Sequence, residues 1–72
     1  MLVYEGDDRE RQVNWLRGLA ANIAENLGEG TAAELVGYAL SQEGRESWGI
    51  ELPNWFDAQD RRLLVRFVGE NL

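Results

Sequence analysis

The chain lacks three residue types altogether: its 72 residues include no cysteine, no histidine and no lysine, so all seven of its basic residues are arginines. Without cysteine the protein cannot form disulfide bonds, and without cysteine and histidine it cannot form the usual structural zinc sites. Ser-His-Asp and Cys-His catalytic groups are excluded because an obligatory member of each is missing. Apolar packing must therefore hold this chain together.

The length of the chain favours a single domain over residues 1–72, because domains usually need about 50 residues or more. A domain of this size buries only about 60% of the surface that its unfolded chain exposes, so its stability is marginal. With disulfides and soft-metal sites excluded, the remaining sources of stability are closely packed helices or self-association. The hydrophobic fraction of 44% and the three tryptophans fit either source.

Thirteen acidic residues against seven basic ones give the chain a formal net charge of -6. Nonspecific binding to nucleic acid uses lysine and arginine to neutralise phosphates, and anionic membranes attract basic segments, so the charge argues against both kinds of partner. A basic protein surface is the better electrostatic complement. Since a net negative charge also keeps a small protein in solution, the charge alone assigns no function.

No segment of the sequence predicts export or membrane insertion. The apolar start of the chain ends after four residues, at Glu5, whereas the apolar region of a signal peptide needs about 7 to 15 residues. No apolar run approaches the roughly 18 residues of a membrane span. We therefore expect a cytoplasmic protein with no membrane partner.

Three amphipathic stretches, separated by glycines, predict an all-α fold: a small domain of three main helices. The first stretch covers residues 8–27, with Asp7 or Asp8 as its N-terminal cap and Gly28 after its end. Its apolar residues spread over roughly 180° of the helix, which is wider than the stripe of about 100° that a surface helix needs. We therefore expect this helix either at the centre of the fold or in a dimer interface.

The other two stretches carry clear start signals. Thr31 and Glu34 form a capping box, and the short turn before it predicts a hairpin of the first two helices. Asp57 is a suitable cap for the third helix. Residues 63–68 of that helix are also rich in strand-forming side chains, and a short apolar run does not by itself distinguish a helix from a buried strand. The cap and the flanking charges favour the helix.

The connection between the second and third helices, residues 44–57, is long and unusually apolar for a small helical domain. Aromatic side chains on a loop are typical of protein-binding surfaces, but the same residues can also fold over a small core as a lid. Trp15 lies at the edge of the first helix's apolar sector, either at a subunit interface or beneath this connection. We name five candidate partner-binding residues: Trp15, Trp48, Ile50, Trp55 and Phe56.

The beginning of the chain offers one further element. Residues 1–4 are apolar and can pair with residues 49–52, which predicts a possible short N-terminal strand beside the connection. Pro53 interrupts any regular element that follows.

The acidic residues do not form a recognisable metal or catalytic site. Glu5, Asp7 and Asp8 are the densest group, but they lack the 12-residue frame of a calcium loop. A pair of carboxylates can hydrolyse glycosides, yet a substrate pocket of about 300 to 1,000 Å³ is hard to enclose in a core of this size. We therefore expect no enzyme activity, no cofactor, no metal and no small-molecule substrate.

These observations predict a small acidic protein–protein interaction or regulatory module. The expected partner is another protein, including a second copy of the chain in a homodimer, with no direct binding to nucleic acid. The wide apolar sector of the first helix and the tryptophans of the connection carry this prediction. The alternative is an acidic inhibitor whose carboxylates mimic nucleic acid on a basic enzyme surface.

Overall fold

The computed structural model describes residues 5–27 and 29–72, with side chains from residue 8 onward. In these residues the chain forms four helices: α1 (Glu5–Leu27), α2 (Ala32–Leu40), α3 (Gln42–Trp48) and α4 (Ala58–Asn71). The described part contains no strand, which confirms the all-α class. The expected number of three helices is wrong, because the first five residues of the predicted connection, 44–48, belong to the short helix α3.

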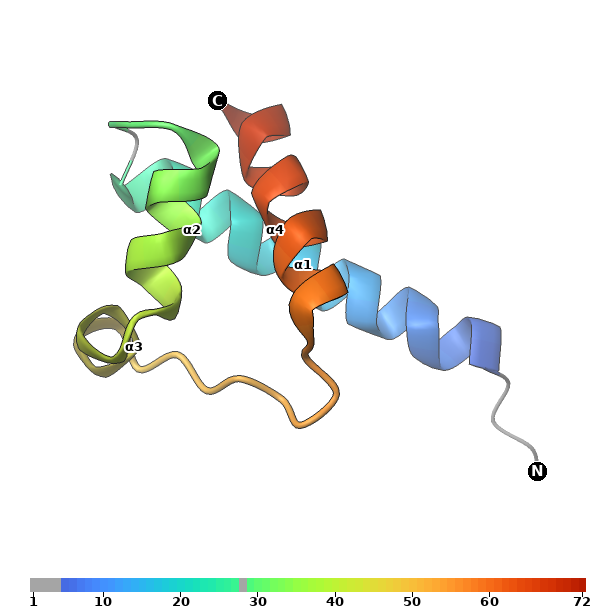
Figure 1. Cartoon of the computed structure of the whole chain (residues 1–72). Coiled ribbons are helices and arrows are strands. Elements are labelled where there is room, and N and C mark those ends of the chain that lie inside the picture. The colour runs from blue at the N-terminus through green and yellow to red at the C-terminus, as the bar shows by residue number, and fades with distance from the viewer. Residues whose placement is uncertain (1–4, 28) are drawn as a thin grey trace.

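The longest helix is α1, and α3 packs against α2 instead of against it (Figure 1). With 23 residues α1 spans about 34 Å. Both α2 and α4 pack against it, while its N-terminal turns extend past α4. The helix begins at Glu5, so the expected cap at Asp7 or Asp8 is wrong and both residues lie inside the helix. Asp8 is acidic and lies near the start of the helix, where the helix dipole favours negative charge.

The core lies where α1, α2 and α4 meet. Thirteen apolar residues of the described part pack against this core while remaining partly exposed, which is more than the core itself contains. The core is therefore small relative to the apolar residues around it, as expected for a domain of this length. Its buried apolar side chains are Leu16, Ala20, Ile23, Leu35, Val36, Ala39, Leu64, Phe67 and Val68.

The expected capping box at the start of α2 is present. Thr31 Oγ1 accepts a hydrogen bond from the Glu34 N–H at 3.2 Å, and Glu34 Oε1 accepts one from the Thr31 N–H at 3.1 Å. α2 ends at Leu40 because the backbone of Ser41 is extended, and the Ser41 side chain then caps α3 by accepting from the Gly44 N–H at 3.1 Å. Two helices are thus joined by a single residue.

The connection proper starts after α3. Gly49 ends that helix with a φ of 66°, in the left-handed region that glycine adopts without strain. The chain then runs without helix or strand to Asp57, whose Oδ1 accepts the Asp60 N–H at 3.0 Å and caps α4 as expected. Residues 63–68 lie within α4 and are helical. The possible N-terminal strand, residues 1–4, lies outside the described residues, and residues 49–52 show no strand.

Candidate protein-binding groove

An open groove runs along one side of α1, between this helix and the chain from Trp48 to Trp55. Three hollows of about 420, 410 and 480 Å³ follow one another along it. The first and second hollows share Trp15, and the second and third share Leu19, Asn22 and Ile50. We call this row of adjoining hollows the α1 groove.

The helical repeat of α1 explains why one wall of the groove is continuous. Residues three and four positions apart share a helix face, and the wall residues of α1 follow this spacing over about 27 Å. The opposite wall comes from the end of α3 and from the connection. The α1 wall contains Asp8, Gln12, Trp15, Leu19, Asn22 and Asn26, and the opposite wall contains Trp48, Ile50, Glu51, Pro53 and Trp55.

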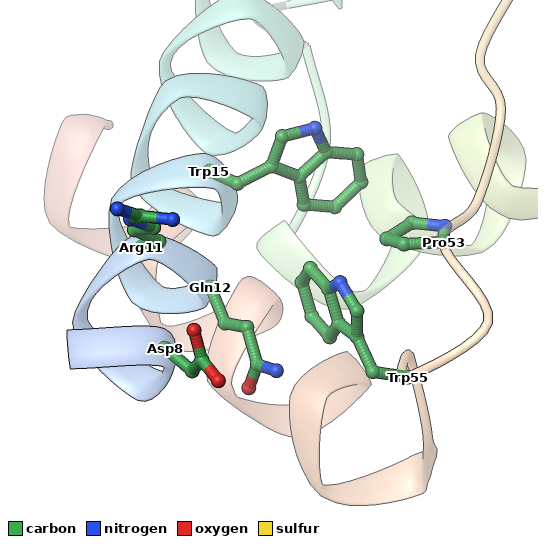
Figure 2. Close-up of a pocket in the computed structure, with 6 residues that line it drawn as sticks. All are labelled: Asp8, Arg11, Gln12, Trp15, Pro53 and Trp55. Carbon is green, nitrogen blue, oxygen red and sulfur yellow. The ribbon is translucent and has the colours of Figure 1, made fainter. Parts of the chain in front are cut away.

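Aromatic contacts hold the connection against α1. The ring centroids of Trp15 and Trp55 lie 5.5 Å apart with an interplanar angle of 84°. Phe56 lies 6.5 Å from Trp15 and 6.4 Å from Trp55. Edge-to-face pairs of this kind add to the stability that burial alone gives. Figure 2 shows Trp15, Trp55 and Pro53 at the first hollow, with Gln12 and Asp8 beside them.

The structure brings all five predicted residues to this side of α1. Trp15, Trp48, Ile50 and Trp55 line the hollows, whereas Phe56 supports the two tryptophans from the aromatic cluster. Each of the five packs against the core, as a lid residue does, and each is only half-buried. The connection is therefore a lid whose outer surface contributes to the groove.

The sequence reasoning missed several residues that line the groove. Leu19 lines the groove, although the apolar pattern of α1 does not distinguish it from the core residues. Gln12, Asn22 and Asn26 also line the groove, and the spacing of Asn22 and Asn26 with Trp15 and Leu19 places them on one face. That spacing was the available signal.

The opposite side of α1 is engaged with α4. Arg9 Nη1 lies 2.9 Å from Asp60 Oδ1, and the Asp60 side chain is only 3% exposed. The guanidinium of Arg17 lies 4.3 Å from the centre of the Phe67 ring. These contacts fix the rotation of α1 about its own axis. The groove is thus formed by the side of α1 that α4 leaves free.

The charge of the chain is unevenly divided. Residues 25–57 contain seven acidic residues and one arginine, which gives a net charge of -6, while the remaining residues contain six acidic residues and six arginines, which gives zero. Asp8 and Arg11 both line the first hollow, but Glu51 lines the second and no arginine lines the second or third. The groove is therefore neutral at its Asp8 end, carries one acidic residue in its middle hollow and has no charged lining residue at its α3 end.

No family model matches this chain, and no curated protein or solved structure matches it either. Among the residues that the structure describes, no group of three or more carboxylates is placed to hold a metal ion. None of the helices described here has the length and hydrophobicity needed to cross a membrane.

Proposed function

We propose that this chain is a non-catalytic protein-interaction module and that the α1 groove is its binding surface. The observation that carries the proposal is the gathering of Trp15, Leu19, Trp48, Ile50 and Trp55, from two separate parts of the sequence, around one continuous groove. Every tryptophan of the chain lines this groove.

The energetics of half-buried aromatic side chains support this role. Tryptophan is among the residues that contribute most to protein–protein binding, because a large rigid surface is buried at little cost in entropy. Packing against the core already holds these side chains in place, so a partner that covers them has less side-chain motion to restrict. Burial of the remaining apolar surface contributes about 25 cal/mol for each Å² that is removed from water.

Site-specific crosslinking in the native cell tests the proposal. A photoreactive benzoylphenylalanine replaces Asn22 in the groove or, as a control, Gln59, which is exposed on α4 and does not line the α1 groove. We expect discrete protein adducts from position 22 and few from position 59, with mass spectrometry identifying the partner. Equal labelling from both positions, or none from position 22, contradicts the proposal.

We also propose self-association, and crosslinking from the same position tests it. A second copy would give a crosslink between two copies at position 22, and sedimentation equilibrium at micromolar concentration would show a dimer. The partly exposed apolar residues around the small core favour it, since a second copy can cover them. A chain that sediments only as a monomer contradicts the homodimer and leaves binding to another protein in place.

A second candidate function, mimicry of nucleic acid, rests on the uneven distribution of charge along the sequence. The acidic part of the chain includes Glu43 and Glu46 on α3, which are exposed and lie outside every hollow. If a basic enzyme surface binds this part, replacing both glutamates with glutamine weakens binding of the partner protein, whereas substitution of Trp48 does not. If the α1 groove is the binding surface, substitution of Trp48 weakens binding and the two glutamate substitutions do not.

A further inference from the structure

We propose that the α1 groove binds an extended, basic segment of a partner protein, with the carboxamides of α1 hydrogen-bonded to the segment's backbone. This inference rests on the proposed function and adds the conformation and the charge of the partner. Three observations carry it: the carboxamides along one wall, the length of the groove and Glu51 in its middle hollow.

The carboxamides favour an extended partner over a helical one. The side chain of Asn22 makes no hydrogen bond within the described part, and Asn26 donates only to the Asn22 carbonyl oxygen, at 2.8 Å. The oxygen of Gln12 already accepts a hydrogen bond from Arg9 Nη1 at 3.0 Å, so we base the inference on the two asparagines. A carboxamide can donate to and accept from the same peptide group. A partner helix satisfies its own backbone groups and offers no such peptide group, whereas an extended segment presents free N–H and C=O groups along its length.

The dimensions of the groove fit a short extended segment. The α1 wall from Asp8 to Asn26 is about 27 Å long, which corresponds to roughly eight residues at about 3.3 Å per residue. In an extended chain alternate side chains point the same way, so one set can enter the hollows while the other stays at the rim. The hollows are lined by Trp15, Leu19, Ile50 and Trp48, so the inward side chains are expected to be apolar.

The charge of the groove selects basic side chains at the rim. Glu51 is the one charged residue that lines the middle hollow, and the chain as a whole has a net charge of -6. A segment rich in arginine or lysine complements this charge, and an acidic segment is repelled by it. A second copy of the chain carries the same net charge of -6 and is the poorer complement.

Designed peptides test the inference on the full chain. The first probe is a capped nine-residue peptide that alternates valine with arginine, and the second has glutamate in place of arginine. The third is a capped 18-residue peptide of leucine, alanine and arginine with leucine at helical spacing. Calorimetry gives the affinities, and tryptophan emission reports on the groove because all three tryptophans line it. We expect the valine–arginine peptide to bind at least tenfold more tightly than either of the others.

Matched variants locate the peptide on the chain. Asn22→Ala removes a groove carboxamide, and Asn14→Ala removes one from the same helix outside the groove; both asparagines are exposed. We expect Asn22→Ala to weaken binding at least fivefold and Asn14→Ala to leave it unchanged. For the charge, Glu51→Gln is expected to weaken binding about threefold, while the exposed Glu43→Gln has no effect. Circular dichroism is used to check that all four variants fold.

The possible failures are distinguishable from one another. Tighter binding of the helical peptide, or equal behaviour of the Asn22 and Asn14 variants, overturns the extended segment. Equal affinity for the glutamate peptide overturns the charge selection. If position 22 crosslinks to a protein in the cell but the valine–arginine peptide does not bind, the inference is wrong and the proposed function stands. If position 22 gives no crosslink either, both are wrong.

Discussion

At the scale of single residues, two glycines show how differently the same residue type can act in this chain. Gly44 is buried at the α2–α3 junction, and a Cβ atom there would overlap the carbonyl oxygen of Tyr38. Gly18 lies exposed in the middle of α1 with nothing within 4 Å of the position of its Cβ. The first glycine is required by packing, whereas the second only lowers the stability of the helix.

We predict that Gly44→Ala destabilises the protein by about 2 kcal/mol, because α3 must move away from the last turn of α2 to admit the methyl group. For a chain of this length such a loss lowers the Tm by roughly 10 °C. Thermal unfolding followed by circular dichroism measures the shift.

The control for this substitution is Gly18→Ala. It is expected to raise the stability by about 0.5 to 1 kcal/mol, because alanine is the better helix former and meets no neighbour. A Gly44→Ala protein that unfolds within about 0.5 kcal/mol of the original chain would show that the α2–α3 junction is not tightly packed.

At the scale of helices and connections, some elements were predictable from the sequence and others were not. The three main helices were predicted because apolar periodicity and the caps at Thr31 and Asp57 are local signals. α3 was missed because it has few apolar residues and contains Gly44, which reads as the end of a helix when its packing is unknown. The start of α1 was placed too late for a related reason, since acidic residues suit both a cap and a first turn.

The candidate site was also predictable only in part from the sequence. The aromatic residues of the groove were found because a tryptophan-rich connection is unusual in any sequence. The pairing of Trp15 with Trp55 was not predictable, because it depends on how the connection returns across α1. The ion pair of Arg9 with Asp60 joins residues 51 positions apart, and no local sequence pattern predicts it. The carboxamides were missed because asparagine and glutamine on a helix are also ordinary surface residues.

The capping box of α2 makes a prediction about pH. Hydrogen bonds from the backbone and side chain of Thr31 hold the pKa of Glu34 below its ordinary value. A carboxylate whose pKa is lowered on folding stabilises the protein above its unfolded pKa, about 4.3, and this contribution disappears as the pH falls through the lowered value. We expect the stability difference between the original chain and Glu34→Gln to be largest near neutral pH and to vanish in acid.

Urea unfolding of both proteins between about pH 7 and pH 2.5 measures this difference. Glu29→Gln, at an exposed neighbouring position outside the capping box, serves as the control. A difference for Glu34→Gln that stays constant down to the lowest pH would contradict the role assigned to the Thr31 hydrogen bonds.

At the scale of the whole molecule, size and charge act together. The core of the described part is small, and the apolar residues around it are only partly covered. The net charge lies within residues 25–57, of which Glu51 lines the middle hollow of the α1 groove. Under the proposed function the charge has a role beyond solubility, because a negatively charged chain attracts basic partners and repels acidic ones.

This arrangement predicts that salt has opposite effects on the binding of a second copy of the chain and on the binding of a basic segment. Two copies that meet at their grooves bring like charges together, so screening favours their association, and the dimer fraction rises between about 0.01 and 0.3 M salt as the Debye length falls from roughly 30 Å to below 10 Å. Binding of the valine–arginine peptide weakens over the same range. Sedimentation equilibrium and calorimetry measure the two trends, and replacing Glu51 with glutamine should reduce both slopes. If the dimer is strongest at low salt, opposite charges and not apolar contacts hold the copies together, and the groove is not the surface through which they meet.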